Sequence, residues 1–131
     1  MELLNIIVAT MAGFGLGAVW YNVLSEPWMD AAGIPRGPDG QPEGGMDPKL
    51  LVLGFVMQLL VAGMMSHIFR SSGVTTLGAG LVSGAGVGLF LISPWIVLNN
   101  SYAMRPWKLS LIDGGYATLA CAVIGLVLTL F

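Results

Sequence analysis

The chain has 131 residues, of which 56% are hydrophobic and 9% charged, with 19 glycines and a formal net charge of −2. This composition excludes an ordinary water-soluble domain, in which about a quarter of the residues are charged. We therefore expect a single all-α domain over residues 1–131, integral to a membrane. Membrane lipids should surround it, and nucleic acid is not an expected partner.

Runs with few charges locate four predicted transmembrane helices, because a helix that rises about 1.5 Å per residue needs roughly 20 apolar residues to cross the hydrocarbon core. The predicted helices cover about 3–25, 49–69, 74–98 and 109–131, which makes two helical hairpins. A secretory signal peptide is a poorer interpretation of the first run. It has Glu2 in place of a basic region, and it is longer than the apolar part of such a peptide.

Glycines at a spacing of four mark two of these helices. Gly13 and Gly17 lie in the first, and Gly80, Gly84 and Gly88 in the third. In lipid, small residues on one face allow two helix backbones to approach closely. We expect helices one and three to pack tightly, either on each other or on copies in a neighbouring subunit. A glycine-lined pore is the functional alternative.

The segment 26–48 between the first two helices is rich in proline and acidic residues, and it is predicted to be an extended or turn-rich acidic loop. Glu26 and Pro27 are expected to end the first helix. This loop and the 99–108 loop lie on one side of the membrane, which we call the loop side. Both chain termini and the short turn at 70–73 lie on the other, the terminal side.

Lysine and arginine divide unevenly between the two sides. The terminal side has Arg70, whereas the loop side has Arg36, Lys49, Arg105 and Lys108. The positive-inside rule counts these residues, so it predicts that loops 26–48 and 99–108 are cytoplasmic.

Aromatic residues show the same asymmetry. The loop side or its interface holds Trp20, Tyr21, Trp28, Trp95, Tyr102 and Trp107, with Tyr116 about one turn deeper. An interfacial belt explains this preference, since these rings favour the headgroup region. Belts normally form at both interfaces, however, so a cavity or a partner-docking face is a second interpretation.

Asp113 is an acidic residue inside the fourth predicted helix, roughly 7 to 8 Å from the helix start. A carboxylate in the bilayer costs several kcal/mol unless it is partnered, solvated or protonated. Tyr116 follows on the same helical face. Other polar side chains that could reach this depth are Trp20, Tyr21, Asn22, Asn99, Asn100 and Arg105. This cluster is predicted to anchor the helix ends by hydrogen bonds, with proton or cation handling as the alternative.

Other reactive side chains are isolated in the sequence. His67 lies near the terminal side, so it cannot form a catalytic dyad with Asp113. Gln58, in the middle of the second helix, is expected to tie helices together, and Cys121 reads as a small buried thiol. Ala117, Cys121 and Gly125 give helix four a weaker small face. We expect no enzymatic activity, no bound metal and no cofactor.

The segments LGAVWYNVLSEPWM and LSLIDGGYATLACAVIGLVL, together with the glycine-rich third helix, resemble domain-of-unknown-function family 1761. The resemblance covers nearly the whole chain in order. It implies a four-helix integral protein of the bacterial cytoplasmic (inner) membrane, without an established activity. It also implies signature positions at Trp20, Tyr21, Asp113, Gly114 and Tyr116. The insertion at 34–47 departs from the shorter first loop expected of the family.

Two function classes follow from these observations. The first is a structural or accessory protein that packs with other membrane subunits or with itself. The second is a small homo-oligomeric transporter or channel with Asp113 in its path. One intramembrane acid without a pair of broken helices makes a weak transport site, so the accessory class is the preferred expectation.

Overall fold

The computed structural model describes residues 2–40, 42 and 47–131 of the chain, and this part is all-helical. The elements are α1 (Glu2–Val23), α2 (Ser25–Ala32), α3 (Pro48–Ser72), α4 (Leu77–Gly86), the π-helical η1 (Val87–Ile92), α5 (Ser93–Tyr102) and α6 (Trp107–Leu128). Residues 41 and 43–46 of the predicted acidic loop lie outside the described residues. In the described part of that loop, an isolated bridge pairs Arg36 with Pro42.

Four helices in the described residues are long and apolar enough to cross a membrane: Glu2–Val23, Pro48–Ser72, Leu77–Tyr102 and Trp107–Leu128. The third of these consists of α4, η1 and α5 in sequence. The prediction of an all-helical chain with four such helices is confirmed, and the helices indicate an integral membrane protein.

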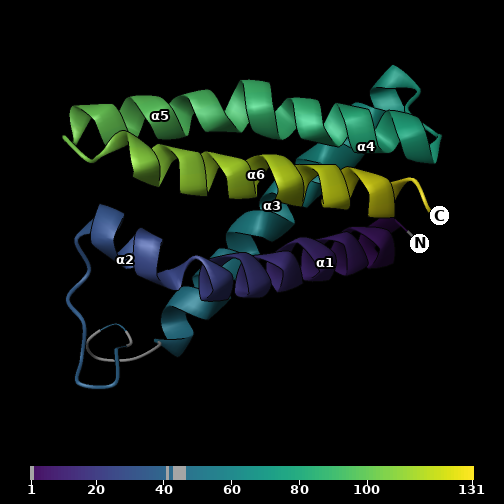
Figure 1. Ribbon diagram of the computed structural model, residues 1–131. Helices are drawn as coiled ribbons and strands as arrows, with labels where there is room; N and C mark the ends of the chain where they lie inside the picture. Colours follow the sequence, from purple (N-terminus) through teal and green to yellow (C-terminus); the bar gives the residue numbers. More distant parts are fainter. Residues whose placement is uncertain (1, 41, 43–46) are drawn as a thin grey trace.

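Helix α6 lies at the centre of the arrangement. The α4–η1–α5 helix runs alongside one of its faces and α1 lies against another, while α3 crosses behind at a steep angle and contacts both α1 and α6 (Figure 1). The chain termini lie next to each other at one end, with α2 and the turn before α6 at the opposite end (Figure 1). The buried core draws on α1, α3 and α6: Ala9, Ala62, Met65, Phe69, Cys121 and Ile124.

The glycines of the first and third spans face α6 rather than each other. A Cβ at Gly13 would fall against Ile124, and one at Gly17 against the Tyr116 hydroxyl. The glycines of the third span face small residues of α6: Gly80 faces Gly125, Gly84 faces Cys121, and Gly88 faces Ala117. Spans one and three therefore pack on α6 and not on each other, while their packing on copies in a neighbouring subunit stays a prediction. The small face of α6 explains the difference, because it lets α4 approach to backbone contact.

Helix α2 (Ser25–Ala32) occupies the start of the segment that was predicted to be a loop. Helix α1 ends at Val23, and Pro27 lies in the first turn of α2. A proline at this point cannot donate to the carbonyl four residues earlier, which is that of Val23, and its ring crowds that carbonyl. The helix therefore breaks earlier than the predicted Glu26–Pro27 stop, and it restarts in a new direction. Gly33, with φ 72°, closes α2 by donating its N–H to the Met29 carbonyl.

The third span is wider in its middle than a regular α-helix, and it begins at Leu77 and not at the predicted 74. Pro94 has no N–H for the Phe90 carbonyl, and the Ser93 N–H bonds to the Gly88 carbonyl five residues back, which is π-helical geometry. The span then continues to Tyr102 instead of ending at 98. The predicted 99–108 loop is consequently reduced to a short turn, in which Met104 adopts φ 56°.

Candidate functional site

Asp113 makes its side-chain contact with the first span. The Tyr21 Oη donates a hydrogen bond to the Asp113 Oδ1 at 2.6 Å, and both residues are partly buried. This distance is typical of a charge-assisted O–H···O bond to a carboxylate. The neighbouring α1 residue reaches the same part of α6, since the Trp20 Nε1 donates to the Ile112 carbonyl at 3.0 Å. Consecutive residues of α1 thus bind consecutive residues of α6.

Tyr116 forms the second half of the network, about one turn deeper. Its hydroxyl donates to the Gly13 carbonyl at 2.7 Å, and it accepts a bond of 2.7 Å from the Gln58 Nε2. A hydroxyl both donates and accepts, so this one oxygen joins α1, α3 and α6. The Tyr116 ring also meets the Tyr21 ring edge to face, with centroids 5.3 Å apart.

Gln58 was identified from the sequence as a residue that ties helices together, and the structure gives it that contact. Its amide oxygen is buried and has no hydrogen-bond partner among the described residues. A Cβ on Gly13 would lie 3.0 Å from this oxygen, so the glycine leaves room for the amide group. The network is therefore satisfied at Asp113 and Tyr116, and less completely at Gln58.

Several residues that were candidates for the cluster lie elsewhere. Asn22 is exposed on α1. Arg105 donates its Nη1 to the Ala32 carbonyl at 2.7 Å, which fastens the end of α2, and Asn100 donates to the Ser110 hydroxyl at 3.3 Å. The structure thus brings together Trp20, Tyr21, Asp113 and Tyr116. It adds Gln58 and the Gly13 carbonyl, which the predicted cluster did not include.

The loop-side aromatic residues divide into two sets. The inner set packs within the molecule, where the Trp28 ring, carried by α2, meets the Tyr21 ring edge to face at 6.0 Å. The outer set stays on the surface, with exposed fractions of 64% for Trp95, 82% for Tyr102 and 70% for Trp107. The outer set takes no part in the hydrogen bonds around Asp113, which involve Trp20, Tyr21 and Tyr116.

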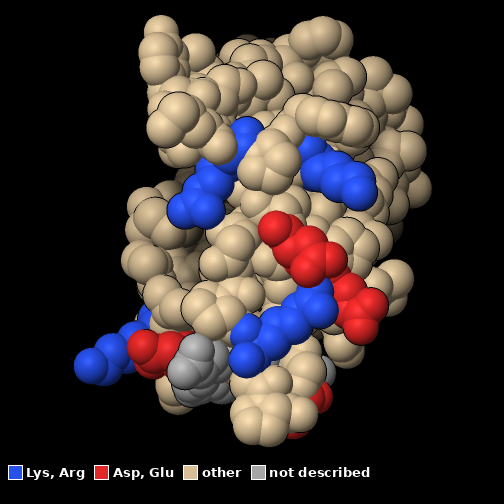
Figure 2. Space-filling model, turned by 60° about the vertical axis from the view of Figure 1, so that its left-hand side comes forward, with Lys and Arg blue, Asp and Glu red and all other residues tan. Residues whose placement is uncertain are grey.

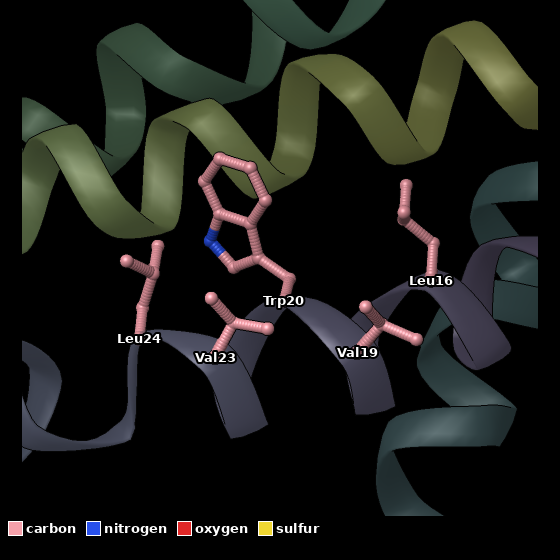
Figure 3. Close-up of a pocket in the computed structure, with 5 residues that line it drawn as sticks. All are labelled: Leu16, Val19, Trp20, Val23 and Leu24. Carbon is pink, nitrogen blue, oxygen red and sulfur yellow. The ribbon is translucent and has the colours of Figure 1, made fainter.

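A recess of about 390 Å³ lies beside Trp20, whose side chain extends from α1 toward α6 (Figure 3). The residues that line it are Leu16, Val19, Trp20, Val23 and Leu24. Apart from the indole, which is bonded to Ile112, these side chains are aliphatic, and Asp113 is not among them. The recess therefore gives the carboxylate no polar opening.

Charged side chains gather at the loop-side end, where Lys and Arg lie among Asp and Glu (Figure 2). One contact there joins Arg36 to Asp30 at 2.6 Å. At the terminal end, Arg70 forms an ion pair with Glu2. Within residues 2–40, 42 and 47–131, no group of three or more His, Cys, Asp or Glu is placed to hold a metal ion.

The chain matches a known protein family. The model of a family described as "Protein of unknown function (DUF1761)" matches residues 4–129. Among curated proteins and among solved structures, no match to the chain is found. The family therefore assigns no activity to the network around Asp113.

Proposed function

The chain belongs to the DUF1761 family of unknown function, and we propose that it is a non-catalytic accessory protein that packs laterally with other membrane subunits or with copies of itself. The observation that carries the proposal is the bond from Tyr21 to Asp113. An acidic residue in a span usually marks a functional path. Here its hydrogen bond holds α1 against α6, so the fold itself accounts for it.

The rest of the network supports an anchoring role over transport. The Tyr116 hydroxyl uses its proton on Gly13 and accepts from Gln58, so both contacts are made within the chain. The recess beside Trp20 is nearly all aliphatic. An ion path would need exchangeable polar groups open to water at both ends, and these contacts give no support for one.

The outer aromatic residues support lateral association. Tyr102 follows Trp95 by seven residues, so both lie on one face of α5 and differ by about 10 Å along the helix axis. One headgroup layer does not readily hold two rings at such different depths. An exposed indole N–H below that layer gains from an acceptor, which another membrane subunit can supply. The exposed leucines Leu91 and Leu98 extend the same face.

Purification in mild detergent, with mass spectrometry of the co-eluting proteins, tests the accessory role. We expect the chain to elute with a second membrane protein or as a defined oligomer, and Trp95→Leu to reduce that association. Val82→Ala is the control, because Val82 is 71% exposed and lies on α4, at the far end of the same span from Trp95. A monomer without partners, unchanged by Trp95→Leu, would contradict the proposal.

Reconstitution into liposomes tests the transport alternative. The anchoring role predicts no ion or proton flux that depends on Asp113. Flux through the wild type that disappears in Asp113→Asn, while the protein remains as stable as before, would replace the accessory role with a transporter or channel.

We further infer that the protein lies in the bacterial cytoplasmic membrane with its loop side in the cytoplasm, since four of the five lysine and arginine residues are on that side. A reporter active only in the cytoplasm should work when inserted at Gly40 and fail when fused after Phe131. The reverse pattern would invert the orientation.

A further inference from the structure

A second recess, of about 460 Å³, lies at the terminal end, far from the aromatic residues of the loop side. It forms where the start of α1, the end of α3, the turn after α3 and the end of α6 meet. Its polar side chains come from all four of these segments: Glu2, Asn5, Ser66, Arg70, Thr75 and Thr129. We call it the terminal recess. Because four spans begin or end there, it lies at one surface of the membrane.

Two opposite charges lie side by side in the terminal recess. Arg70 and Glu2 form an ion pair, yet their side chains are 67% and 49% exposed. The Ser66 hydroxyl is 3.5 Å from the other carboxylate oxygen of Glu2. A guanidinium has five N–H donors and a carboxylate about four acceptor positions, so most of this capacity remains available. The recess thus offers a positive and a negative group next to each other.

The same recess has an apolar part. Phe69 is buried, and Val74 and Leu128 are packed against the core cluster beside it. A ligand held there meets charge on one side and hydrocarbon on the other. At a membrane surface, this combination matches a phospholipid, whose headgroup is charged and whose acyl chains are apolar.

We propose that the terminal recess binds a phospholipid whose headgroup carries a phosphate diester beside a primary ammonium, as in phosphatidylethanolamine. Arg70 would bind the phosphate oxygens and Glu2 the ammonium, so that a neutral pair meets a neutral headgroup of complementary polarity. A purely anionic headgroup would satisfy Arg70 but place negative charge beside Glu2. A trimethylammonium group cannot donate a hydrogen bond to the carboxylate.

The test measures lipid retention by native mass spectrometry, after the delipidated full-length protein is incubated with equal amounts of three lipids in detergent. Phosphatidylethanolamine should be retained about fivefold more than phosphatidylcholine or phosphatidylglycerol, the preference expected of exposed charges. Equal retention of the three lipids would overturn the proposal. So would displacement of the lipid by glycerophosphoethanolamine at a similar concentration, because the site would then be one for a soluble ligand.

Substitutions sharpen the test. Glu2→Gln keeps an acceptor for Arg70, so helix packing should survive, but the preference should shift toward phosphatidylglycerol. Arg70→Gln should lower the retention of all three lipids, because each carries the phosphate, while Glu2 still favours the primary ammonium. Lys108→Gln, which removes a cation at the opposite end, is the control and should behave as the wild type. Unchanged preference in Glu2→Gln, or unchanged retention in Arg70→Gln, with the variant folded, would contradict the proposal.

Discussion

Two of the contacts that α6 makes, with α1 and with the α4–η1–α5 helix, both use glycine, but glycine has a different purpose in each. In the α1 contact, side chains of α6 fill the space above the glycines, as Ile124 does at Gly13 and Tyr116 at Gly17. In the contact with α4 and η1, which we call the α4 contact, the backbone of α6 occupies that space, since a Cβ at Gly88 in η1 would lie 2.5 Å from the Ala117 carbonyl oxygen.

This difference has a physical consequence. A side chain can rotate away from a new methyl group, although it loses its own contacts when it does so. A helix backbone cannot move locally, because its hydrogen bonds hold it in place. The α4 contact should therefore tolerate no added side chain, whereas the α1 contact should respond in proportion to the hydrogen bonds that are lost.

The largest effect is expected at Gly84. A Cβ there would lie 3.0 Å from the Cys121 carbonyl carbon and 3.1 Å from the Ala122 Cα, which are both backbone atoms. Gly84→Ala should lower the free energy of unfolding by about 3 kcal/mol, the upper part of the range for overpacking, and Gly84→Leu should prevent folding. Thermal unfolding in detergent and the monodisperse yield measure this.

Ala18→Leu is the matched control for Gly84→Leu, because Ala18 is exposed on α1. If Ala18→Leu and Gly84→Leu reduce stability equally, close backbone contact between α4 and α6 does not govern the fold.

The next effect is expected at Asp113, in the α1 contact. Asp113→Leu leaves the Tyr21 hydroxyl without its acceptor and should cost about 1 to 3 kcal/mol. Asp113→Asn retains an acceptor oxygen and should cost less. In the Tyr21→Phe background, Asp113→Leu should cost much less than in the wild type, because the bond is already absent. Additive losses in this cycle would mean that Asp113 makes its contribution elsewhere.

The sequence predicts the spans well and their rotation poorly. The apolar length of each helix determines four spans, and the depth of Asp113 marks it as a residue that needs a partner. Which α1 side chain bonds to it could not be predicted. A membrane helix such as α1 is apolar on nearly all faces, so hydrophobic periodicity does not show which face meets α6. Asn22 and Tyr21 were therefore equivalent candidates, and only Tyr21 points to Asp113.

Two prolines disturb the helices in which they lie. Pro27 and Pro94 each deprive a carbonyl four residues earlier of its donor, and the first span breaks at Val23, while the third becomes π-helical around Phe90. The rule places the disturbance before the proline. The rule does not say whether the helix breaks or widens, because packing against α6 decides that. At the third span, the Ser93 hydroxyl donates a hydrogen bond of 3.0 Å to the Gly114 carbonyl of α6.

A smaller effect is expected at Gly17. A Cβ there would lie 2.6 Å from the Tyr116 hydroxyl, which can rotate away at the cost of its bonds to Gly13 and Gln58. Gly17→Ala should therefore cost about 1 to 2 kcal/mol, the value of these two hydrogen bonds, and less than Gly84→Ala. In a Tyr116→Phe background the cost should fall further, since no hydroxyl remains to be displaced. A loss at Gly17 as large as that at Gly84 would remove the distinction between the two contacts.

The smallest effect, and the one of opposite sign, is expected at Gly15. It lies on α1 between Gly13 and Gly17, yet a Cβ at this position meets no atom within 4 Å. Alanine lowers the backbone entropy of the unfolded chain, so less entropy is lost when the helix forms. Gly15→Ala should therefore raise the free energy of unfolding by about 0.5 to 1 kcal/mol. The same unfolding assay in detergent measures this change. Destabilisation by Gly15→Ala would mean that this face of α1 is covered, as it would be by a partner subunit, since the isolated chain offers no atom for the methyl group to strike.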